Sequence, residues 1–242
     1  MWLKGKRDTM SETIAVIPAG GRGKRLRPIT DYIPKPMLPL GAEEKPVLEH
    51  IIEWIKKFGV RNYLLLVGYR YKQIVNYFRD GDRWGVNIEY SIDDEKHRGT
   101  GGALLKAYKK GMLRGYDYIL LWYGDIIAYV DIDDMINKCR TDEVMVVAVK
   151  DYRLPIGVLN VSNNIVTNIL EKPLLDRFVG IGIHLFGHLS LRYLDEIKVC
   201  NFDVGYHLLP FLLKNNIKIR VFHYDGVWRD IGSKLEDALG QV

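Results

Sequence analysis

Glycines, basic residues and prolines are concentrated in one segment of the chain, PAGGRGKRLRPITDYIPKPMLP, which runs from Pro18 to Pro39. Gly20, Gly21 and Gly23 allow the backbone to turn sharply and to bring its N–H groups close to anionic oxygens without clashes at Cβ. The segment also supplies cations, which are Lys24, Arg25, Arg27 and Lys35. Together, the N–H groups and the cations favour binding of a polyphosphate.

The residues around this loop are expected to hold it in a defined place. The apolar run from Thr13 to Ile17 predicts a buried strand. The glycines then follow the carboxyl end of that strand, where open α/β sheets bind ligands. Pro34 and Pro36 flank Lys35 and restrict the backbone on both sides, so the position of the ammonium group is expected to be fixed.

Two common phosphate-binding motifs do not fit the loop. A Walker loop has Ser or Thr after its lysine, whereas Arg25 follows Lys24. A dinucleotide-binding fingerprint has a third glycine at the position where Leu26 stands. The whole pattern, G-x-G-x-R-x-x-P-x-T followed by P-K-P, instead closely resembles the signature of the sugar-1-phosphate nucleotidylyltransferases.

Later segments continue this resemblance, which covers the chain from about Thr13 to Gly232. The matching segments are Gly99-Thr100-Gly101-Gly102, Gly124-Asp125, Glu171-Lys172-Pro173 and Trp228-Arg229-Asp230-Ile231-Gly232. Their fixed order makes the combination more specific than any single segment. The G-T-G-G loop is similar to that of mannose- and heptose-1-phosphate guanylyltransferases, although His97 and Arg98 replace the usual Pro-Leu.

The resemblance implies a reaction in which a sugar 1-phosphate attacks the α-phosphorus of a nucleoside triphosphate and releases pyrophosphate. Both reactants are anions, so alignment and countercharge must overcome their repulsion. Arg25 and Lys35 are the predicted catalytic residues. Arg25 is expected to bind the β- and γ-phosphates, and Lys35 to contact the α-phosphate or the attacking phosphate. Asp125 and Asp230 are predicted to bind Mg²⁺, because hard oxygen ligands suit an ion that bridges triphosphate oxygens.

The resemblance also assigns binding residues for the two substrates. The predicted nucleotide-binding residues are Ala19, Gly20, Gly21, Gly23, Lys24, Asp94, Gly99, Thr100 and Gly101. The predicted sugar-phosphate-binding residues are Gly157, Glu171, Lys172 and Gly182, with Lys172 holding the phosphate. Relatives often have asparagine where Gly180 stands. Glycine removes one hydrogen-bonding group and leaves extra room, so this position does not define which sugar binds.

Asp94 carries the prediction of the nucleotide base. It stands five residues before Gly99, where the family commonly contacts the base edge. A carboxylate can accept hydrogen bonds from guanine N1–H and the N2 amino group together. A side-chain amide instead suits a pyrimidine edge, which has both a donor and an acceptor. GTP is therefore favoured, and UTP or dTTP, with a glucose-1-phosphate-type substrate, is the alternative.

Composition limits the classes of protein to consider. The chain has 242 residues, 48% of them hydrophobic, and a net charge of +5. Its basic residues cluster in the first loop, which suits small anionic substrates and argues against nucleic acid. Cys139 and Cys200 have no metal-ligand spacing, and apolar runs are too short to cross a membrane, so a cytoplasmic protein without membrane contact is expected. A homo-oligomer stays possible.

Strand-like runs alternate with helical patterns, which predicts a Rossmann-like α/β fold with a mixed, mainly parallel sheet and helices on both faces. Residues 13–242 are expected to form one nucleotidyltransferase domain after an extension at 1–12. The runs at 157–161 and 166–170 are expected in a mixed sheet that forms the sugar-binding half. The C-terminal β-helix of many relatives is expected to be missing.

Two other functions fit the sequence less well. A nicotinamide-dependent oxidoreductase is disfavoured by Leu26 and leaves the P-K-P segment and Asp230 unexplained. A non-catalytic regulatory subunit of a pyrophosphorylase would tolerate loss of Arg25, Lys35, Asp125 or Asp230. All four residues are present in the chain.

Overall fold

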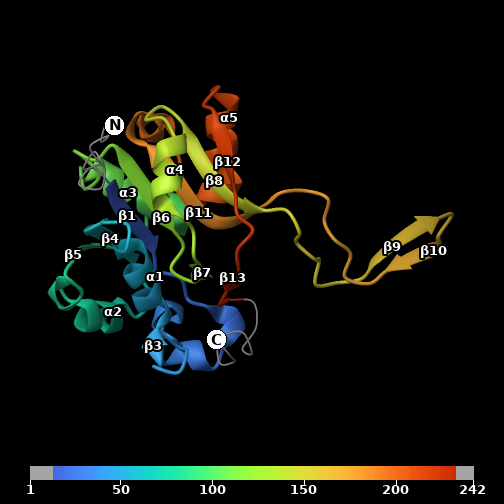
Figure 1. Cartoon of the computed structure of the whole chain (residues 1–242), viewed down its shortest axis with the longest axis horizontal. Helices are drawn as coiled ribbons and strands as arrows, with labels where there is room; N and C mark the ends of the chain where they lie inside the picture. Colours follow the sequence, from blue (N-terminus) through green and yellow to red (C-terminus); the bar gives the residue numbers. More distant parts are fainter. Residues whose placement is uncertain (1–12, 233–242) are drawn as a thin grey trace, which may run out of the picture.

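A seven-stranded sheet forms the centre of the molecule in the computed structural model, which describes residues 13–232 (Figure 1). The strand order is β12-β8-β11-β6-β1-β4-β5. The strands are β1 (Thr13–Pro18), β4 (Asn62–Val67), β5 (Asn87–Ile92), β6 (Tyr118–Trp122), β8 (Val144–Val149), β11 (Val179–Gly187) and β12 (Ile219–His223). Only β11 runs antiparallel to its two neighbours, β6 and β8. The predicted mixed, mainly parallel sheet is confirmed; the predicted extension at 1–12 lies outside the described residues.

Helices cover both faces of this sheet. Alternate residues of β1 belong to two separate cores: Ala15 and Ile17 pack on one side, Ile14 and Val16 on the other. The first core includes α1 (Val47–Lys56), α2 (Tyr71–Phe78) and α4 (Ile132–Lys138), and the second includes α3 (Gly99–Lys109) and α5 (Leu209–Lys214). Because β1 is buried on both faces, it reads as a continuous apolar run rather than an alternating one.

Helix α1 illustrates how the sequence sets these elements. Leu48, Ile51, Ile52 and Ile55 recur at helical spacing, and all four are buried against the sheet. Pro46 occupies the N-cap position with extended backbone, and Gly59 turns the chain with a φ of 83°. The helical spacing of apolar residues, with Pro46 just before it and Gly59 just after it, therefore accounts for the position of α1.

Short elements complete the body of the molecule. Two small ladders pair β2 (Pro39–Leu40) with β3 (Lys45–Pro46) and β7 (Ile126–Ala128) with β13 (Trp228–Asp230). The single-turn and irregular helices are η2 (Lys24–Leu26), η3 (Ile29–Asp31), η4 (Lys35–Met37), η5 (Asp82–Trp84), η6 (His188–Glu196) and the π-helix η7 (Val204–Leu208). No β-helix occurs within residues 13–232, and no helix there is long and apolar enough to span a membrane.

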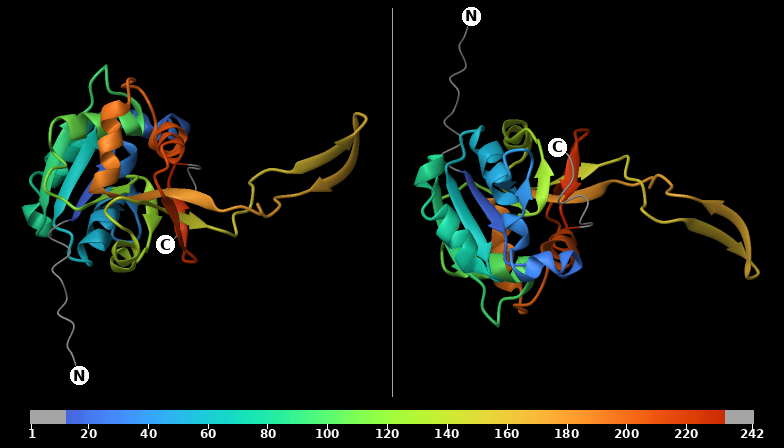
Figure 2. Two further views of the ribbon diagram at one scale, coloured as in Figure 1. Left: turned by 90° about the horizontal axis from the view of Figure 1, so that it is seen from above. Right: turned by 90° about the horizontal axis from the view of Figure 1, so that it is seen from below.

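A hairpin of β9 (Val158–Ser162) and β10 (Ile165–Leu170) projects from the body as a long arm (Figure 2). The two strands pair with each other and form their own two-stranded sheet. Asn163 and Asn164 adopt positive φ values of 49° and 63° at the tip, a conformation that asparagine tolerates and that suits a tight hairpin. The strands at 157–161 and 166–170 were thus predicted correctly, but placing them in a larger mixed sheet was wrong.

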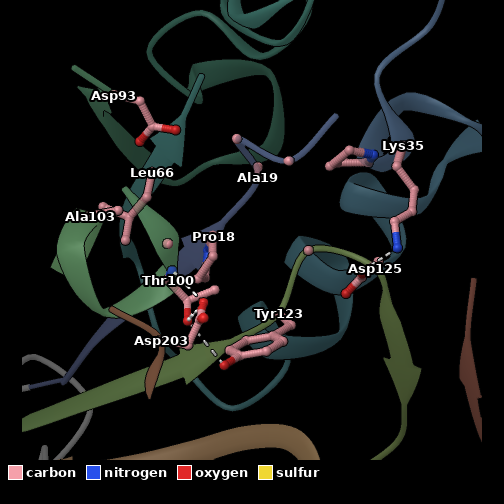
Figure 3. Close-up of a pocket in the computed structure, with 15 residues that line it drawn as sticks. Pro18, Ala19, Lys35, Leu66, Asp93, Thr100, Ala103, Tyr123, Asp125 and Asp203 are labelled. Carbon is pink, nitrogen blue, oxygen red and sulfur yellow. Dashed lines mark hydrogen bonds and ion pairs between the residues drawn. The ribbon is translucent and has the colours of Figure 1, made fainter. Parts of the chain in front are cut away.

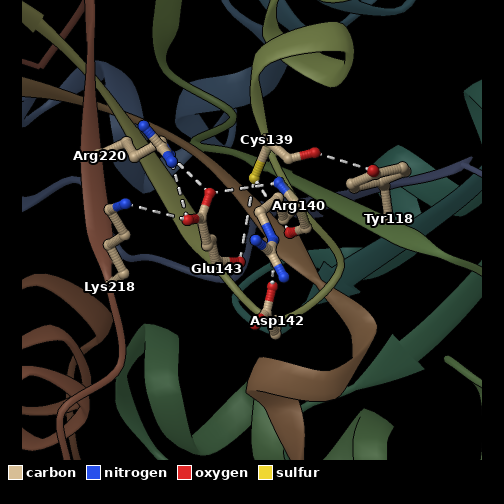
Figure 4. A network of polar contacts seen from close by, with 7 residues as sticks. All are labelled: Tyr118, Cys139, Arg140, Asp142, Glu143, Lys218 and Arg220. Carbon is tan, nitrogen blue, oxygen red and sulfur yellow. Dashed lines mark hydrogen bonds and ion pairs between the residues drawn. The ribbon is translucent and has the colours of Figure 1, made fainter.

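Edge strand β12 is fixed to β8 by charged side chains (Figure 4). Glu143, which precedes β8 and is only 3% exposed, accepts hydrogen bonds from Arg220 Nε at 2.5 Å and Nη2 at 2.9 Å. Hydrogen bonding to Arg220 holds the pKa of Glu143 below its usual value. Nearby, burial raises the pKa of the free Cys139 thiol to about 12, which makes it a poor nucleophile.

Candidate active site at the carboxyl ends of the central strands

A cavity of about 350 Å³ opens beyond the carboxyl ends of β1, β4 and β6 (Figure 3). From β1 the chain proceeds outward through β4 and β5, and then returns to the other side of β1 as β6. This reversal of direction creates a crevice beside β1, and open α/β sheets bind ligands at such switch points. The lining residues are Pro18, Ala19, Gly20, Gly21, Lys35, Pro36, Leu66, Asp93, Gly99, Thr100, Ala103, Tyr123, Gly124, Asp125 and Asp203.

The glycine-rich loop forms one wall of the cavity. Ala19 N donates to Leu66 O at 2.7 Å, and Gly20 O accepts from Tyr69 N at 3.0 Å, so the loop is tied to the end of β4. A Cβ atom on Gly20 would lie 2.4 Å from Asp93 Oδ2 and 3.0 Å from the backbone nitrogen of Gly68. Glycine is therefore needed at position 20 for the loop to approach the neighbouring strand end.

Lys35 and Asp125 form an ion pair in the cavity, with Lys35 Nζ 2.5 Å from Asp125 Oδ2. Lys35 begins η4 directly after Pro34, whose extended backbone directs the chain into this turn. Asp125 follows β6 by three residues and lies in the turn before β7. Lys35 and Asp125 are 90 positions apart in the sequence, and the fold brings their side chains into contact.

Asp230 is brought to the same place by the ladder of β7 and β13. Asp230 lies opposite Ile126, and Ile231 N donates to Asp125 O at 2.9 Å. Gly232 N donates to Asp230 Oδ1 at 2.7 Å, and a side chain on Gly232 would collide with Lys35 Nζ. The ammonium and the two carboxyl-bearing residues are therefore neighbours.

These two carboxylates suit a hard cation. Within residues 13–232 no cluster of three or more His, Cys, Asp or Glu could hold a metal ion by itself. Mg²⁺ commonly keeps several waters and takes only one or two protein carboxylates together with substrate phosphates. The donor set of Asp125 and Asp230 fits an ion of that kind.

Asp93, rather than Asp94, faces the cavity. Asp93 follows β5 directly, and its N–H donates to Val67 O at 2.7 Å, which continues the sheet by one residue and turns the side chain inward. Burial raises the pKa of Asp93. Asp94 points away: its carboxylate binds Lys106 Nζ at 2.8 Å and the N–H of His97 at 2.7 Å, which hold its pKa well below the usual range.

Thr100 lines the cavity together with two polar residues that were not anticipated from the sequence, Tyr123 and Asp203. The hydroxyl of Tyr123 lies 3.4 Å from Thr100 Oγ1. Thr100 Oγ1 accepts a hydrogen bond from Val204 N at 3.0 Å. Asp203 Oδ1 accepts a hydrogen bond from Thr100 N at 3.3 Å. Burial raises the pKa of the Tyr123 hydroxyl, so it stays protonated at neutral pH. Tyr123 could have been found from its place between β6 and Gly124, but no local signal pointed to Asp203.

The predicted site residues fall into three groups. Those that line the cavity are Ala19, Gly20, Gly21, Lys35, Gly99, Thr100 and Asp125. Those that do not line the cavity but lie on segments next to it are Gly23, Lys24, Arg25, Gly101, Gly182 and Asp230. Gly101 packs under the Phe202 ring, and Gly182 lies behind the Tyr123 ring. Arg25 is exposed on η2, next to the loop, and forms no ion pair with another described residue.

The third group stands apart from the cavity. Gly157, Glu171 and Lys172 lie at the base of the β9–β10 arm, where all three are exposed. A Cβ on Gly157 would lie 3.1 Å from Glu171 Oε2, so these residues are neighbours of one another. None of them lines the cavity. Asp94 belongs to this group as well, because its carboxylate is already paired outside the cavity.

Comparison with known proteins matches a protein family over nearly the whole chain. The family described as "Nucleotidyl transferase" matches residues 14–238. A "Bifunctional protein GlmU" from Methanococcus maripaludis strain S2 is 33% identical over 226 residues, which cover 90% of this chain and 51% of that protein. A D-glycero-alpha-D-manno-heptose 1-phosphate guanylyltransferase from Aneurinibacillus thermoaerophilus is 38% identical over 125 residues, about half of each chain. The chain thus spans about half the length of these relatives.

Solved structures share the fold. The structure of HddC from Yersinia pseudotuberculosis complexed with GMP-PN superposes with a TM-score of 0.70 at 23% identity, covering 93% of this chain and 96% of that one. A putative glucose-1-phosphate thymidylyltransferase from Bacillus anthracis, in complex with a sucrose, gives a TM-score of 0.71 at 24% identity over 93% of each chain. At this level of identity the agreement establishes the fold, which is that of the nucleotide-diphospho-sugar transferases.

Proposed function

Because the chain belongs to the nucleotidyl transferase family, we propose that it transfers a nucleotidyl group from a nucleoside triphosphate to a sugar 1-phosphate and releases pyrophosphate. The observation that carries this proposal is the meeting of Lys35, Asp125 and Asp230 beside the glycine-rich loop. A cationic group, two hard oxygen donors and the backbone of a glycine-rich loop lie close together, which matches the needs of a triphosphate.

The reaction requires no protein nucleophile. A phosphate oxygen of the sugar 1-phosphate forms a bond to the α-phosphorus, and the bond from that phosphorus to the oxygen bridging to the β-phosphate breaks. Lys35 supplies countercharge at the α-phosphate, and the loop from Ala19 to Gly21 holds the triphosphate in line. Arg25, which is exposed on η2 beside the loop, would bind the departing pyrophosphate. Mg²⁺ at Asp125 and Asp230 would neutralise charge on the triphosphate oxygens.

GTP is the nucleotide that the cavity favours, with Asp93 replacing Asp94 as the residue that contacts the base. A carboxylate offers only acceptors, and the guanine edge offers two adjacent donors, N1–H and the N2 amino group. Uracil and thymine have a single N–H donor between two acceptors, which an aspartate satisfies poorly. The 38% identity to a heptose 1-phosphate guanylyltransferase supports this choice. The similarity to a UTP–glucose-1-phosphate uridylyltransferase of Synechocystis, 28% over 239 residues, keeps UTP as the alternative.

Release of pyrophosphate tests the activity directly. The purified chain is incubated with Mg²⁺, each nucleoside triphosphate in turn and a panel of sugar 1-phosphates. Lys35→Ala is expected to lower kcat/KM by about two orders of magnitude or more, because a preorganised charge at the reacting phosphate is lost. Lys138→Ala, which removes an exposed lysine paired with Asp134 on α4, is the matched control. Circular dichroism verifies that both variants fold, and full activity of folded Lys35→Ala would remove this lysine from the mechanism.

Asp93→Asn tests the choice of base separately from the activity. The amide replaces one acceptor oxygen with a donor, so the preference should shift from GTP toward UTP or dTTP, by about tenfold or more in the ratio of kcat/KM values. Asp94→Asn is the control, since its carboxylate is paired outside the cavity. If Asp94→Asn changes the ratio and Asp93→Asn does not, the assignment reverts to Asp94.

A further inference from the structure

Helix α3 begins at the cavity, and a segment from much later in the chain satisfies the N–H groups at its start. The first turn of a helix has N–H groups without partners inside the helix, and the side chain of the N-cap residue commonly accepts from one of them. The N-cap residue of α3 makes no such hydrogen bond. Gly101 N and Gly102 N instead donate to Phe202 O at 2.9 and 3.1 Å. Thr100 N donates to Asp203 Oδ1 at 3.3 Å, so the later segment caps this helix.

The start of α3 and this later segment are in close contact. Phe202 N donates to Arg98 O at 3.2 Å, and a parallel bridge pairs Arg98 with Asn201. Gly99 has a φ of 75°, and a Cβ atom there would lie 2.4 Å from Phe202 O. A Cβ atom on Gly101 would lie 2.3 Å from the Phe202 ring. Two glycines of the G-T-G-G loop are thus needed for contact with the capping segment.

The cap on Thr100 comes from a side chain, that of Asp203, whereas a backbone carbonyl caps the two glycines. Asp203 is itself the N-cap residue of η7, where an aspartate usually accepts from the N–H groups of its own helix. Its side chain makes no such bond. The backbone of Asp203 is nevertheless fixed by η7, because Asp203 N donates to His207 Nδ1 at 3.0 Å and Asp203 O accepts from His207 N at 3.0 Å. The carboxylate is therefore held in place by one helix and caps another.

The hydroxyl of Thr100 has a full set of hydrogen bonds in this arrangement. Thr100 Oγ1 donates to Asp203 Oδ1 at 3.4 Å and accepts from Val204 N at 3.0 Å. A threonine hydroxyl has one proton and two lone pairs, so the hydroxyl of Tyr123, 3.4 Å away, is the donor to the second lone pair. Thr100, Tyr123 and Asp203 all line the cavity (Figure 3). The orientation of Thr100 toward the cavity thus depends on Asp203.

A fixed start of α3 matters for a ligand, because Gly99 and Thr100 both line the cavity. A loop that already holds its bound conformation loses less freedom when the ligand binds, so the affinity is higher. If only a fraction of the molecules has the loop in that conformation, the apparent affinity falls by the same fraction. Asp203 can therefore control the affinity for a nucleotide without contacting it.

We propose that Asp203 is a positioning residue of the nucleotide site, which holds Thr100 and the first turn of α3 in the conformation that binds a nucleoside triphosphate. The inference rests on the proposed function, because that function requires a nucleoside triphosphate in the cavity. The role requires an acceptor at the right place rather than a charge. Asparagine has a side-chain oxygen that can accept from Thr100, and alanine has none.

Two measurements test the inference. Isothermal titration calorimetry with GTP and UTP, in the presence of Mg²⁺ and without sugar 1-phosphate, gives the Kd, and NMR hydrogen exchange without nucleotide gives the protection of the Thr100 N–H. Asp203→Ala should raise the Kd of the preferred nucleotide by about tenfold or more and speed the exchange by a similar factor, because a hydrogen bond to a carboxylate is lost. Asp203→Asn should stay within about threefold of the natural chain in both measurements.

Asp195→Ala is the matched control. Asp195 also contacts α3, but near its other end, where Asp195 Oδ2 accepts from the Tyr108 hydroxyl at 2.8 Å. This substitution removes an exposed carboxylate bound to the same helix and should change neither the Kd nor the exchange at Thr100. Circular dichroism and thermal unfolding verify that each variant is folded.

The inference is overturned if Asp203→Ala binds nucleotide as tightly as the natural chain. It is also overturned if the affinity falls while the exchange at Thr100 stays the same, since Asp203 would then act on the nucleotide itself. Equal losses of affinity in Asp203→Asn and Asp203→Ala would show that the charge is needed, and would refute the positioning role.

Failure of this inference and failure of the proposed function can be told apart, because binding is measured without a sugar 1-phosphate. A natural chain that binds nucleotide but releases no pyrophosphate with any sugar 1-phosphate overturns the proposed reaction alone. A natural chain that binds no nucleoside triphosphate overturns both.

Discussion

His184 makes the stability of the protein depend on pH in a calculable way. The side chain lies in β11, 4% exposed, between the rings of Tyr123 and Phe186, and its Nδ1 has no hydrogen-bond partner among the described residues. Burial lowers the pKa of His184 from 6.5 to about 4. A charged imidazole is thus strongly disfavoured in the folded protein.

The direction of the effect follows from where the proton binds. Above pH 6.5 the imidazole is neutral in both the folded and the unfolded chain, so it does not make stability depend on pH. Between pH 6.5 and about pH 4 the unfolded chain binds a proton that the folded chain does not, and stability falls by about 1.4 kcal/mol per pH unit. The total loss is about 3 kcal/mol, of which about 2 kcal/mol is reached by pH 5.

Replacing His184 by phenylalanine should remove this contribution. Urea unfolding at pH 7 and pH 5 measures the free energy of unfolding for the natural chain and for His184→Phe. Other titrating groups contribute to both proteins alike, so the loss of stability between the two pH values should be about 2 kcal/mol smaller in the variant. His223→Gln, which removes an exposed imidazole on β12, should leave the loss unchanged within a few tenths of a kcal/mol. Equal losses in the natural chain and His184→Phe would refute the reasoning.

Two further substitutions test other parts of the structure. Asp125→Asn should abolish Mg²⁺-dependent pyrophosphate release, because the proposed metal ligand and the partner of Lys35 are both lost; unchanged turnover with the same metal requirement would make Asp125 structural. Glu143→Gln should lower the free energy of unfolding at pH 7 by about 1 to 3 kcal/mol, because Arg220 loses its charged partner. The pKa of Glu143 is lowered, so this difference should shrink as the pH falls toward that pKa, and a difference independent of pH would contradict the assignment.

Sequence reasoning was reliable where one local signal determined the structure. The run from Thr13 to Ile17 had to be a strand buried on both faces, because it is apolar at consecutive positions rather than alternate ones. The place of Asp125 after a central strand also predicted that its side chain lies at the carboxyl edge of the sheet, where it contacts Lys35.

The sequence did not determine the structure where two neighbouring residues, or two ways of pairing the strands, fitted the same sequence pattern. Asp93 and Asp94 have the same chemistry, and only the hydrogen bond from Asp93 N to Val67 O decides which carboxylate turns inward. The apolar pattern of β9 and β10 predicts strands, but it contains no information on whether they pair with the central sheet or only with each other. Asp203 reaches the cavity through η7, far along the chain from the loop, and only the folded structure reveals it.

The ion pair between Lys35 and Asp125 competes with any ligand that binds either side chain. Each of these groups neutralises the other at 2.5 Å. Any cation that approaches the carboxylate must compete with the ammonium, and any phosphate that approaches the ammonium must compete with the carboxylate. If the proposed function holds, a nucleotide that binds together with its counterion replaces both partners in one exchange, whereas either one alone leaves one charge unpaired. We therefore expect the nucleotide and its counterion to bind cooperatively.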